Sequence, residues 1–311
     1  MSDQDKALPR VTQDSLLNVA IQVWELFLED QGRSPYTVKA FTGDLSILAQ
    51  FFPPDKKVGS VTTNEINQFL DWLQKGRGKP CSPKTLARRI TSIKSFFRWL
   101  RSYGAIVADP AEKVVQKSVI SPLPTVLSPE EHALVMEAAN AYRMDNKPDA
   151  RPYCLLALLL ATSIKKGECR EIDINHLDIE NTEDPGVFIR YANPSYRYKE
   201  RRIPLPNDWI EAYHEYTAQY NPQDKLFPWS PRRLEYILED IGERAGISKH
   251  LSFDMCRWSS ALHDWQEEMD PETLRIKLGV SKIQFRELKL KLTRLAAKAN
   301  QTDRSTDSVN S

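Results

Sequence analysis

The chain has 311 residues, of which 41% are hydrophobic and 27% are charged. Because single cores usually stop growing at about 250 residues, this length predicts two modest domains. The longest apolar run, residues 153–161, is too short to cross a bilayer, which needs about 20 helical residues, and the polar start argues against a secretory signal. We therefore expect a cytoplasmic protein with no membrane partner.

The formal net charge of +1 is unevenly divided along the chain. Residues 1–120 carry 17 Lys and Arg against 12 Asp and Glu, whereas the remainder carries 26 against 30. A polyanion would bind most readily to the basic part, although a solvated surface explains the excess equally well. The four cysteines are scattered without C-x-x-C spacing, so we expect no metal site, no disulfide framework and no cofactor.

Four amphipathic helices are expected in a first domain over residues 12–104, after a flexible start at 1–11. The first covers residues 12–30, where apolar side chains recur at helical spacing. The other three begin with capping signals, namely Ser34 before Pro35, Thr62 three residues before Glu65, and Ser82 before Pro83. Short connections between them favour a compact helical bundle.

Residues 105–127 are rich in proline and lack a clear period, which is typical of a linker. A second domain is expected over residues 128–299, followed by a disordered tail at 300–311. Two short runs, 187–191 and 202–205, predict a β-hairpin. Helices are expected from Ser128 and over 151–162, 208–219, 231–245, 253–268, 271–278 and 281–299. The predicted fold class is therefore mainly α, with a small β-hairpin or sheet in the second domain.

The predicted helix over residues 82–101 carries six basic residues and no acidic one. The six are Lys84, Arg88, Arg89, Lys94, Arg98 and Arg101. On a helix, basic and polar residues form one face and apolar residues form another, so the helix can pack on one side and offer cations on the other. Such helices hold DNA phosphates, although a solvated helix face is the alternative.

Several segments resemble the tyrosine recombinases and phage integrases. SPYTVKAFTGDLSILAQFF, TTNEINQFLDWL and SPKTLARRITSIKSFFRWLRSYG are similar to the family's core-binding domain. LLALLLATSIKKGECREIDINHLDIE resembles its first catalytic segment, with a Thr-Gly-x-Arg-x-x-Glu turn, and YRYKERRIPLP resembles its hairpin. LSFDMCRWSSAL is similar to the His-x-x-Arg helix, and LRIKLGVSKIQFRELKLKL to the closing Leu-Gly-His segment. The resemblance covers roughly residues 12–298 and implies a two-domain clamp on DNA.

The family's reaction implies six catalytic positions. A tyrosine attacks the phosphodiester, two arginines and two histidine-type positions hold the phosphate oxygens, and a lysine protonates the leaving oxygen. Only Arg257 keeps the family's residue here. The other five positions are occupied, in chain order, by Lys165, Tyr196, Asp254, Val280 and Lys289.

These replacements predict a degenerate catalytic domain. Lys165 keeps a charge but lacks the guanidinium fork, Asp254 repels a phosphate, and Val280 has no donor. No tyrosine follows Tyr236, so no shift of register at Lys289 supplies the nucleophile. His250, which precedes the altered motif, is an alternative occupant of the position held by Asp254.

Three functions remain open on the sequence. The first is a catalytically inactive DNA-binding protein that acts in or regulates recombination or integration and is associated with the nucleoid if bacterial. Its contacts to double-stranded DNA would come from the basic helix and from cations of the second domain. These second-domain cations are Lys165, Arg197, Lys199, Arg201, Arg202 and Arg257. The second is an active recombinase with a non-standard or partner-supplied nucleophile. The third is a protein-interaction module whose C-terminal helix, 281–299, docks on a second copy or on another recombinase.

Overall fold

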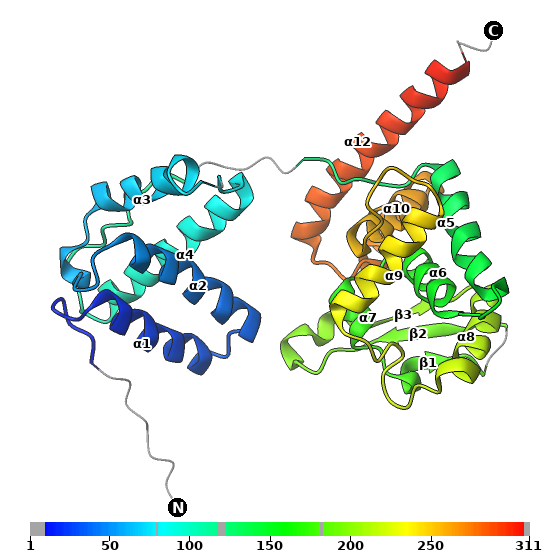
Figure 1. Ribbon diagram of the computed structural model, residues 1–311, viewed down its shortest axis with the longest axis horizontal. Coiled ribbons are helices and arrows are strands. Elements are labelled where there is room, and N and C mark those ends of the chain that lie inside the picture. The colour runs from blue at the N-terminus through cyan, green and yellow to red at the C-terminus, as the bar shows by residue number, and fades with distance from the viewer. Residues whose placement is uncertain (1–9, 79, 117–121, 181–182, 308–311) are drawn as a thin grey trace, which may run out of the picture. The chain divides into compact units, whose positions relative to one another are not determined.

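The computed structural model describes residues 10–78, 80–116, 122–180 and 183–307. The chain divides into two compact units, Met1–Pro122 and Leu123–Ser311, and the division falls inside the predicted linker (Figure 1). Helices dominate, and one small sheet lies in the second unit. The predicted fold class is confirmed.

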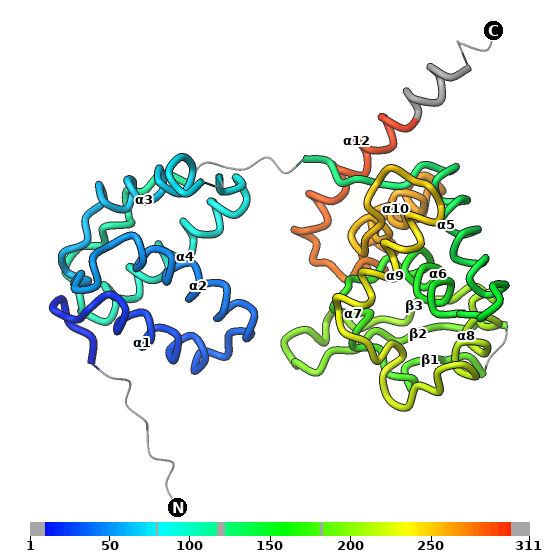
Figure 2. The backbone as a smooth tube through the Cα atoms, in the orientation of Figure 1, coloured from blue at the N-terminus to red at the C-terminus, as the bar shows by residue number. Residues whose placement is uncertain are grey.

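The first unit is a bundle of four helices (Figure 2). They are α1 (Leu17–Asp30), α2 (Pro35–Phe51), α3 (Thr63–Lys75) and α4 (Pro83–Ser102). The three predicted caps are present, because Ser34 and Ser82 accept backbone N–H groups and Thr62 forms a reciprocal capping box with Glu65. Aromatic side chains fill the core, and Trp24, Phe69 and Phe96 are almost fully buried.

The segment that follows α4 belongs to the first unit, so the predicted linker began too early. Ala105, Ile106, Ala111 and Val114 are all buried in the core of the bundle. Proline content suggested a linker. Composition alone does not reveal that these four apolar side chains pack into the core of the helical bundle. We refer to residues 109–116 as the strap, because they lie along α4.

The second unit contains a three-stranded antiparallel sheet in the order β1-β2-β3 (Figure 1). The strands are β1 (Leu177–Asp178), β2 (Gly186–Ile189) and β3 (Arg201–Pro204). The predicted hairpin is confirmed as β2 paired with β3, with Val187 opposite Ile203. Its connection folds as a 3-10 helix, Pro194–Lys199, and β1 was not predicted.

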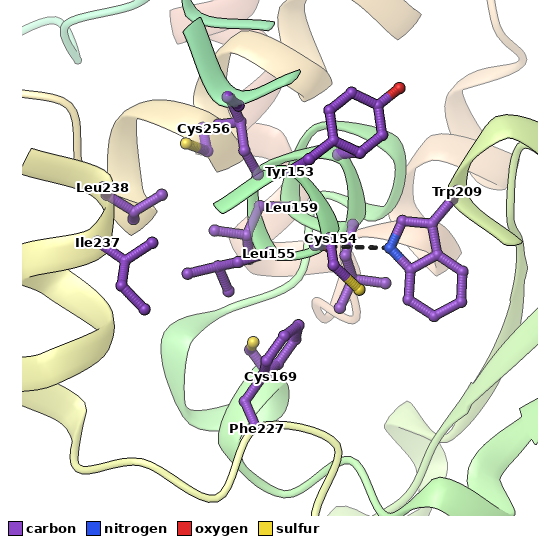
Figure 3. Packing of buried hydrophobic residues seen from close by; sticks show 14 of the residues in the cluster. Tyr153, Cys154, Leu155, Leu159, Cys169, Trp209, Phe227, Ile237, Leu238 and Cys256 are labelled. Atoms are coloured by element: carbon purple, nitrogen blue, oxygen red, sulfur yellow. Dashed lines mark hydrogen bonds between the residues drawn. The ribbon is translucent and has the colours of Figure 1, made fainter. Parts of the chain in front are cut away.

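Helices pack on this sheet around the buried helix α6 (Arg151–Thr162). Figure 3 shows this core, where the Trp209 indole donates a hydrogen bond of 2.8 Å to the Cys154 carbonyl. The remaining helices are α5 (Pro129–Ala141), α7 (Lys166–Arg170), α8 (Asn207–Tyr220), α9 (Pro231–Arg244), α10 (Phe253–Gln266), α11 (Pro271–Lys277) and α12 (Lys282–Asp307).

The last helix, α12, packs within its own chain against α10 and α11. Leu292 and Leu295 are buried with Leu262 and Leu274, whereas Ile283 and Leu290 are exposed. The helix continues to Asp307, beyond the predicted end of the domain at residue 299, and residues 308–311 of the predicted tail lie outside the described residues.

Two identical substitutions on α12 test this packing. Leu292→Ala should lower the free energy of unfolding of the second unit by about 2–5 kcal/mol, because the buried side chain leaves a cavity. Leu290→Ala should change it by less than about 0.5 kcal/mol, because Leu290 is 62% exposed whereas Leu292 is 0% exposed. Urea unfolding of both variants measures the difference, and equal losses would contradict the packing.

Candidate functional site

The basic face of α4 is smaller than the sequence predicted. Arg89 is buried, and its guanidinium lies 3.4 Å from a carboxylate oxygen of Asp44, so it is not part of an exposed face. Arg88 contacts the same carboxylate at 3.0 Å. Asp44 comes from α2, and Ser92 donates a further hydrogen bond of 2.9 Å to it. This buried network joins α2 to α4 and neutralises cations that had seemed unopposed.

The strap opposes a third cation. The Arg101 guanidinium lies 3.6 Å from the Glu112 carboxylate, and the Lys94 ammonium donates to the Glu112 carbonyl oxygen at 3.5 Å. Lys84 and Arg98 are exposed and make no ion pair within the described part of the chain. Acids distant in sequence therefore leave Lys84 and Arg98 as the freest cations of α4.

A second cationic group lies in the second unit, where the end of α6, strand β3 and helix α10 meet the turn Leu278-Gly279-Val280. Arg257 donates to the Ser163 carbonyl oxygen and, at 2.7 Å, to the Leu278 carbonyl oxygen. The Lys165 ammonium donates to the Gly279 carbonyl oxygen at 3.5 Å. Gly279 has a positive φ of 58°, and a Cβ there would lie 2.5 Å from an Arg201 nitrogen, so only glycine fits.

Glu168 organises this group, although it was not singled out from the sequence. It is buried, it accepts bonds of 3.2 and 3.1 Å from Arg201, and it accepts the Tyr191 hydroxyl. Burial acts to raise the pKa of Glu168, but Arg201 and the other donors hold it below its ordinary value. The glutamate of the Thr-Gly-x-Arg-x-x-Glu pattern was the available signal.

We refer to Lys165, Lys199, Arg201 and Arg257 as the cation cluster. Burial lowers the pKa of Lys165, and the charges of the other three members lower it further. Burial likewise lowers the pKa of Arg257, with Arg201 adding to the effect. The structure thus brings together Lys165, Arg201 and Arg257, three of the predicted residues, around one carboxylate. Such a concentration of positive charge suits an anion.

The hairpin contributes fewer free cations than predicted. Arg201 is buried against Glu168, and Arg202 pairs with Asp178 at 3.1 Å and Asp184 at 3.0 Å. Arg197 is exposed, whereas the Lys199 ammonium lies over the Tyr196 ring, 4.6 Å from its centre. The pairing carboxylates, Glu168, Asp178 and Asp184, precede β3 in the sequence. The sequence alone did not show that they pair with the arginines of β3.

The remaining predicted positions do not supply a missing phosphate ligand. Asp254 is exposed in the first turn of α10, and Val280 is buried among apolar side chains. Lys289 extends over the Trp265 ring at 5.7 Å. His250 lies 3.7 Å from Glu239 on α9, and no described contact joins it to the cation cluster.

Neither a membrane span nor a metal site is found in the part of the chain that the structure describes. Among the described residues, no helix is long and apolar enough to cross a membrane. Within the same ranges, no group of three or more His, Cys, Asp or Glu side chains is placed to hold a metal ion.

Comparisons with known proteins cover both units. Residues 21–104 match the model of the phage integrase N-terminal SAM-like domain, and residues 125–285 match that of the phage integrase family. Tyrosine recombinase XerC of Oceanobacillus iheyensis is 24% identical over 267 residues, 80% of this chain and 83% of the relative. Tyrosine recombinase XerD of Listeria innocua serovar 6a is 23% identical over 283 residues, 86% and 92% of the two chains.

Solved structures share the fold at lower identity. XerH site-specific recombinase in a post-cleavage complex with palindromic difH substrate has a TM-score of 0.70 and 18% identity, covering 92% of this chain and 84% of that chain. A lambda integrase dimer bound to a COC′ core site has a TM-score of 0.67 and 15% identity, covering 88% and 77%. At these identities the likeness concerns the fold alone.

The buried Glu168–Arg201 pair predicts a specific response to acid. Glu168→Gln should cost about 3–5 kcal/mol of unfolding free energy near neutral pH, because it leaves Arg201 buried without its partner. Since folding lowers the Glu168 pKa from about 4.5, its stabilisation is present above that value and is lost as the pH falls through the lowered pKa. Urea unfolding across this range should show less acid sensitivity in Glu168→Gln than in the wild type.

Glu267→Gln is the matched control, because Glu267 is exposed on the turn that ends α10. It should change neither the stability at neutral pH nor the response to acid. Identical acid profiles for the wild type and Glu168→Gln would contradict the role of the buried pair.

Proposed function

The chain belongs to the phage integrase family, and we propose that it acts in DNA recombination by binding duplex DNA without cleaving it alone. The observation that carries this proposal is the combination of the cation cluster with Lys289 at the position that the resemblance assigns to the nucleophile. Duplex binding and catalysis need different parts of the family's site, so one can persist without the other.

Cationic surfaces on both units support DNA binding. On α4, Lys84 and Arg98 are exposed and free of acids, and Lys94 reaches only a carbonyl oxygen. In the second unit, Arg197 is exposed, and the cation cluster surrounds one buried carboxylate. Phosphate contacts by such side chains supply affinity that is independent of sequence and falls with salt.

The surroundings of Arg257 support the absence of cleavage by the chain alone. The printed sequence has no tyrosine after Tyr236, and Val280 offers no donor to a phosphate oxygen. Tyr191 is the tyrosine bonded to Glu168 in the cluster, but burial and that carboxylate raise its pKa, so its hydroxyl stays protonated. A protonated phenol is a poor nucleophile.

A second candidate function is recombination with a nucleophile supplied by a partner. The cation cluster favours it, because Arg257 and Lys165, which occupy the family's two arginine positions, lie on the same turn at Leu278 and Gly279. The relatives are named as recombinases, and one similar structure is a dimer on DNA. Exposed Ile283 and Leu290 on α12 give a surface for a second copy or another recombinase.

Duplex binding should depend on the free cations of α4. Replacing Lys84 and Arg98 together with glutamine should weaken binding to duplex DNA and flatten the log–log salt dependence by up to about 1.8, at about 0.9 for each phosphate that is no longer neutralised. Fluorescence anisotropy with a labelled duplex over a salt series measures both quantities.

The matched control replaces Arg33 and Lys39 with glutamine. It removes one arginine and one lysine, as the first variant does. Arg33 precedes α2, and Lys39 lies on α2, where it lines a groove between α1 and α2. Its affinity should stay within about twofold of the wild type, because neither side chain belongs to α4, the helix proposed to contact the phosphates. Equal losses in both double variants would rule out α4 as the contact.

The chain alone should form no covalent adduct with DNA. Neither the wild type nor Lys289→Tyr should yield one on nicked suicide duplexes, because a phenol of pKa about 10 still needs the phosphate ligands that Asp254 and Val280 do not provide. Denaturing gels and mass spectrometry detect the adduct. An adduct on any side chain of this protein would overturn the proposal, and one formed only with a second recombinase present would favour the partner-supplied nucleophile.

A further inference from the structure

The strap follows the basic side of α4 and is fixed at several points. The Gln116 side-chain amide donates bonds of 3.0 Å to the Ala87 carbonyl oxygen and to the Thr91 hydroxyl. Farther along α4, Lys94 and Arg101 reach the carbonyl and carboxylate of Glu112. The strap therefore runs antiparallel to α4, with Glu112 beside the C-terminal half of the helix.

Contacts with the rest of the bundle hold the strap in this register. Ala111 and Val114 are buried in the core on either side of Glu112 and Lys113, which point outward. Thr63 on α3 donates a bond of 2.7 Å to the Pro110 carbonyl oxygen, and Asp109 accepts the Ala111 N–H at 2.8 Å. The position of Glu112 follows from these contacts and does not depend on its own ion pair.

We propose that Glu112 restrains the sequence-independent binding of duplex DNA by α4 and so lowers its affinity for duplex DNA of arbitrary sequence. This inference rests on the proposed binding of DNA by α4. Lys94, Arg98 and Arg101 follow one stripe of the helix at i, i+4 and i+7, so their side chains would approach the same phosphates. Glu112 neutralises one end of this stripe and restrains Lys94.

The ion pair itself has little to do with folding. The side chains of Arg101 and Glu112 are 53% and 67% exposed, so water and salt screen their attraction. An exposed carboxylate beside a cationic stripe nevertheless repels a phosphate and occupies a guanidinium that would otherwise bind one. Its main effect is therefore on an anionic partner.

The effect falls mainly on sequence-independent binding. Phosphate contacts supply essentially all of the non-specific affinity for duplex DNA, whereas hydrogen bonds to base edges distinguish sequences. Removing one phosphate contact therefore weakens binding to arbitrary DNA and leaves any base contacts intact. Glu112 thus lowers the affinity for duplex DNA by a similar factor at every sequence, and discrimination between sequences rests on other residues.

The test uses the full chain and a labelled duplex of random sequence over a salt series. Glu112→Gln should bind up to about tenfold more tightly at low salt, and its log–log salt slope should steepen by about 0.9, as expected when one more phosphate is neutralised. The steeper slope should disappear when Glu112→Gln is combined with Arg101→Gln, because the additional phosphate contact depends on the released guanidinium.

Glu29→Gln is the matched control, because it makes the same substitution at an exposed glutamate of α1. It should leave affinity and slope unchanged, and urea unfolding should show all variants to be folded. An equally large increase in affinity in Glu29→Gln, or a steeper slope that survives Arg101→Gln, would overturn the role of Glu112.

The same assay separates this inference from the proposed function. If the Lys84 and Arg98 double variant loses affinity while Glu112→Gln is unchanged, the inference fails and DNA binding by α4 stands. If the wild type and every variant fail to bind duplex DNA, the proposed function fails, and the inference fails with it.

Discussion

The arrangement of the second unit depends on one buried ion pair, Glu168 with Arg201. The two side chains are each 3% exposed, and they join α7 to strand β3, while Arg201 also donates to the Lys277 carbonyl oxygen at the end of α11. Such a pair contributes little net stability but is costly to break, because either partner alone is a buried charge. Its main consequence is positional. It holds the Gly279 turn against β3, and this turn receives the bonds of Lys165 and Arg257.

Acidic residues govern what the basic residues can do in both units. Asp44 pairs with exposed Arg88 and buries Arg89, and Glu168 buries Arg201. These carboxylates are buried or nearly so, and each is satisfied by several donors, which makes them parts of the scaffold. Glu112 differs because it is exposed and has one weak partner at 3.6 Å. A count of charges in the sequence treats these three acids alike. Their burial separates the structural role of Asp44 and Glu168 from that of Glu112, which an anionic partner can contact.

Local sequence signals predicted most of the fold and part of the site. Caps such as Ser34, Ser82 and Thr62 fixed helix starts, because they depend on neighbours within three residues. The hairpin was likewise predicted from two short apolar runs, and Lys165 and Arg257 were placed near each other through family resemblance. The burial of Arg89 against Asp44, 45 positions earlier in the printed sequence, depends on a contact between two helices. The strap and the role of Glu168 were missed for the same reason, since residues 109–116 and Glu168 act through partners that are distant in sequence.

The electrostatics of the cation cluster favour binding over chemistry in the proposed function. Lys165 and Arg257 both have lowered pKa values, first because they are buried and then because other cations lie nearby. Burial and mutual repulsion therefore disfavour their positive charges in the folded chain. A bound phosphate would offset that repulsion, whether or not the DNA is then cleaved. Cleavage needs more, namely a deprotonated nucleophile and donors aimed at the developing charge. Around Arg257, Tyr191 is kept protonated by Glu168, and Val280 faces an apolar core. The same carboxylate that assembles the cluster therefore disfavours the tyrosine nearest to it as a nucleophile.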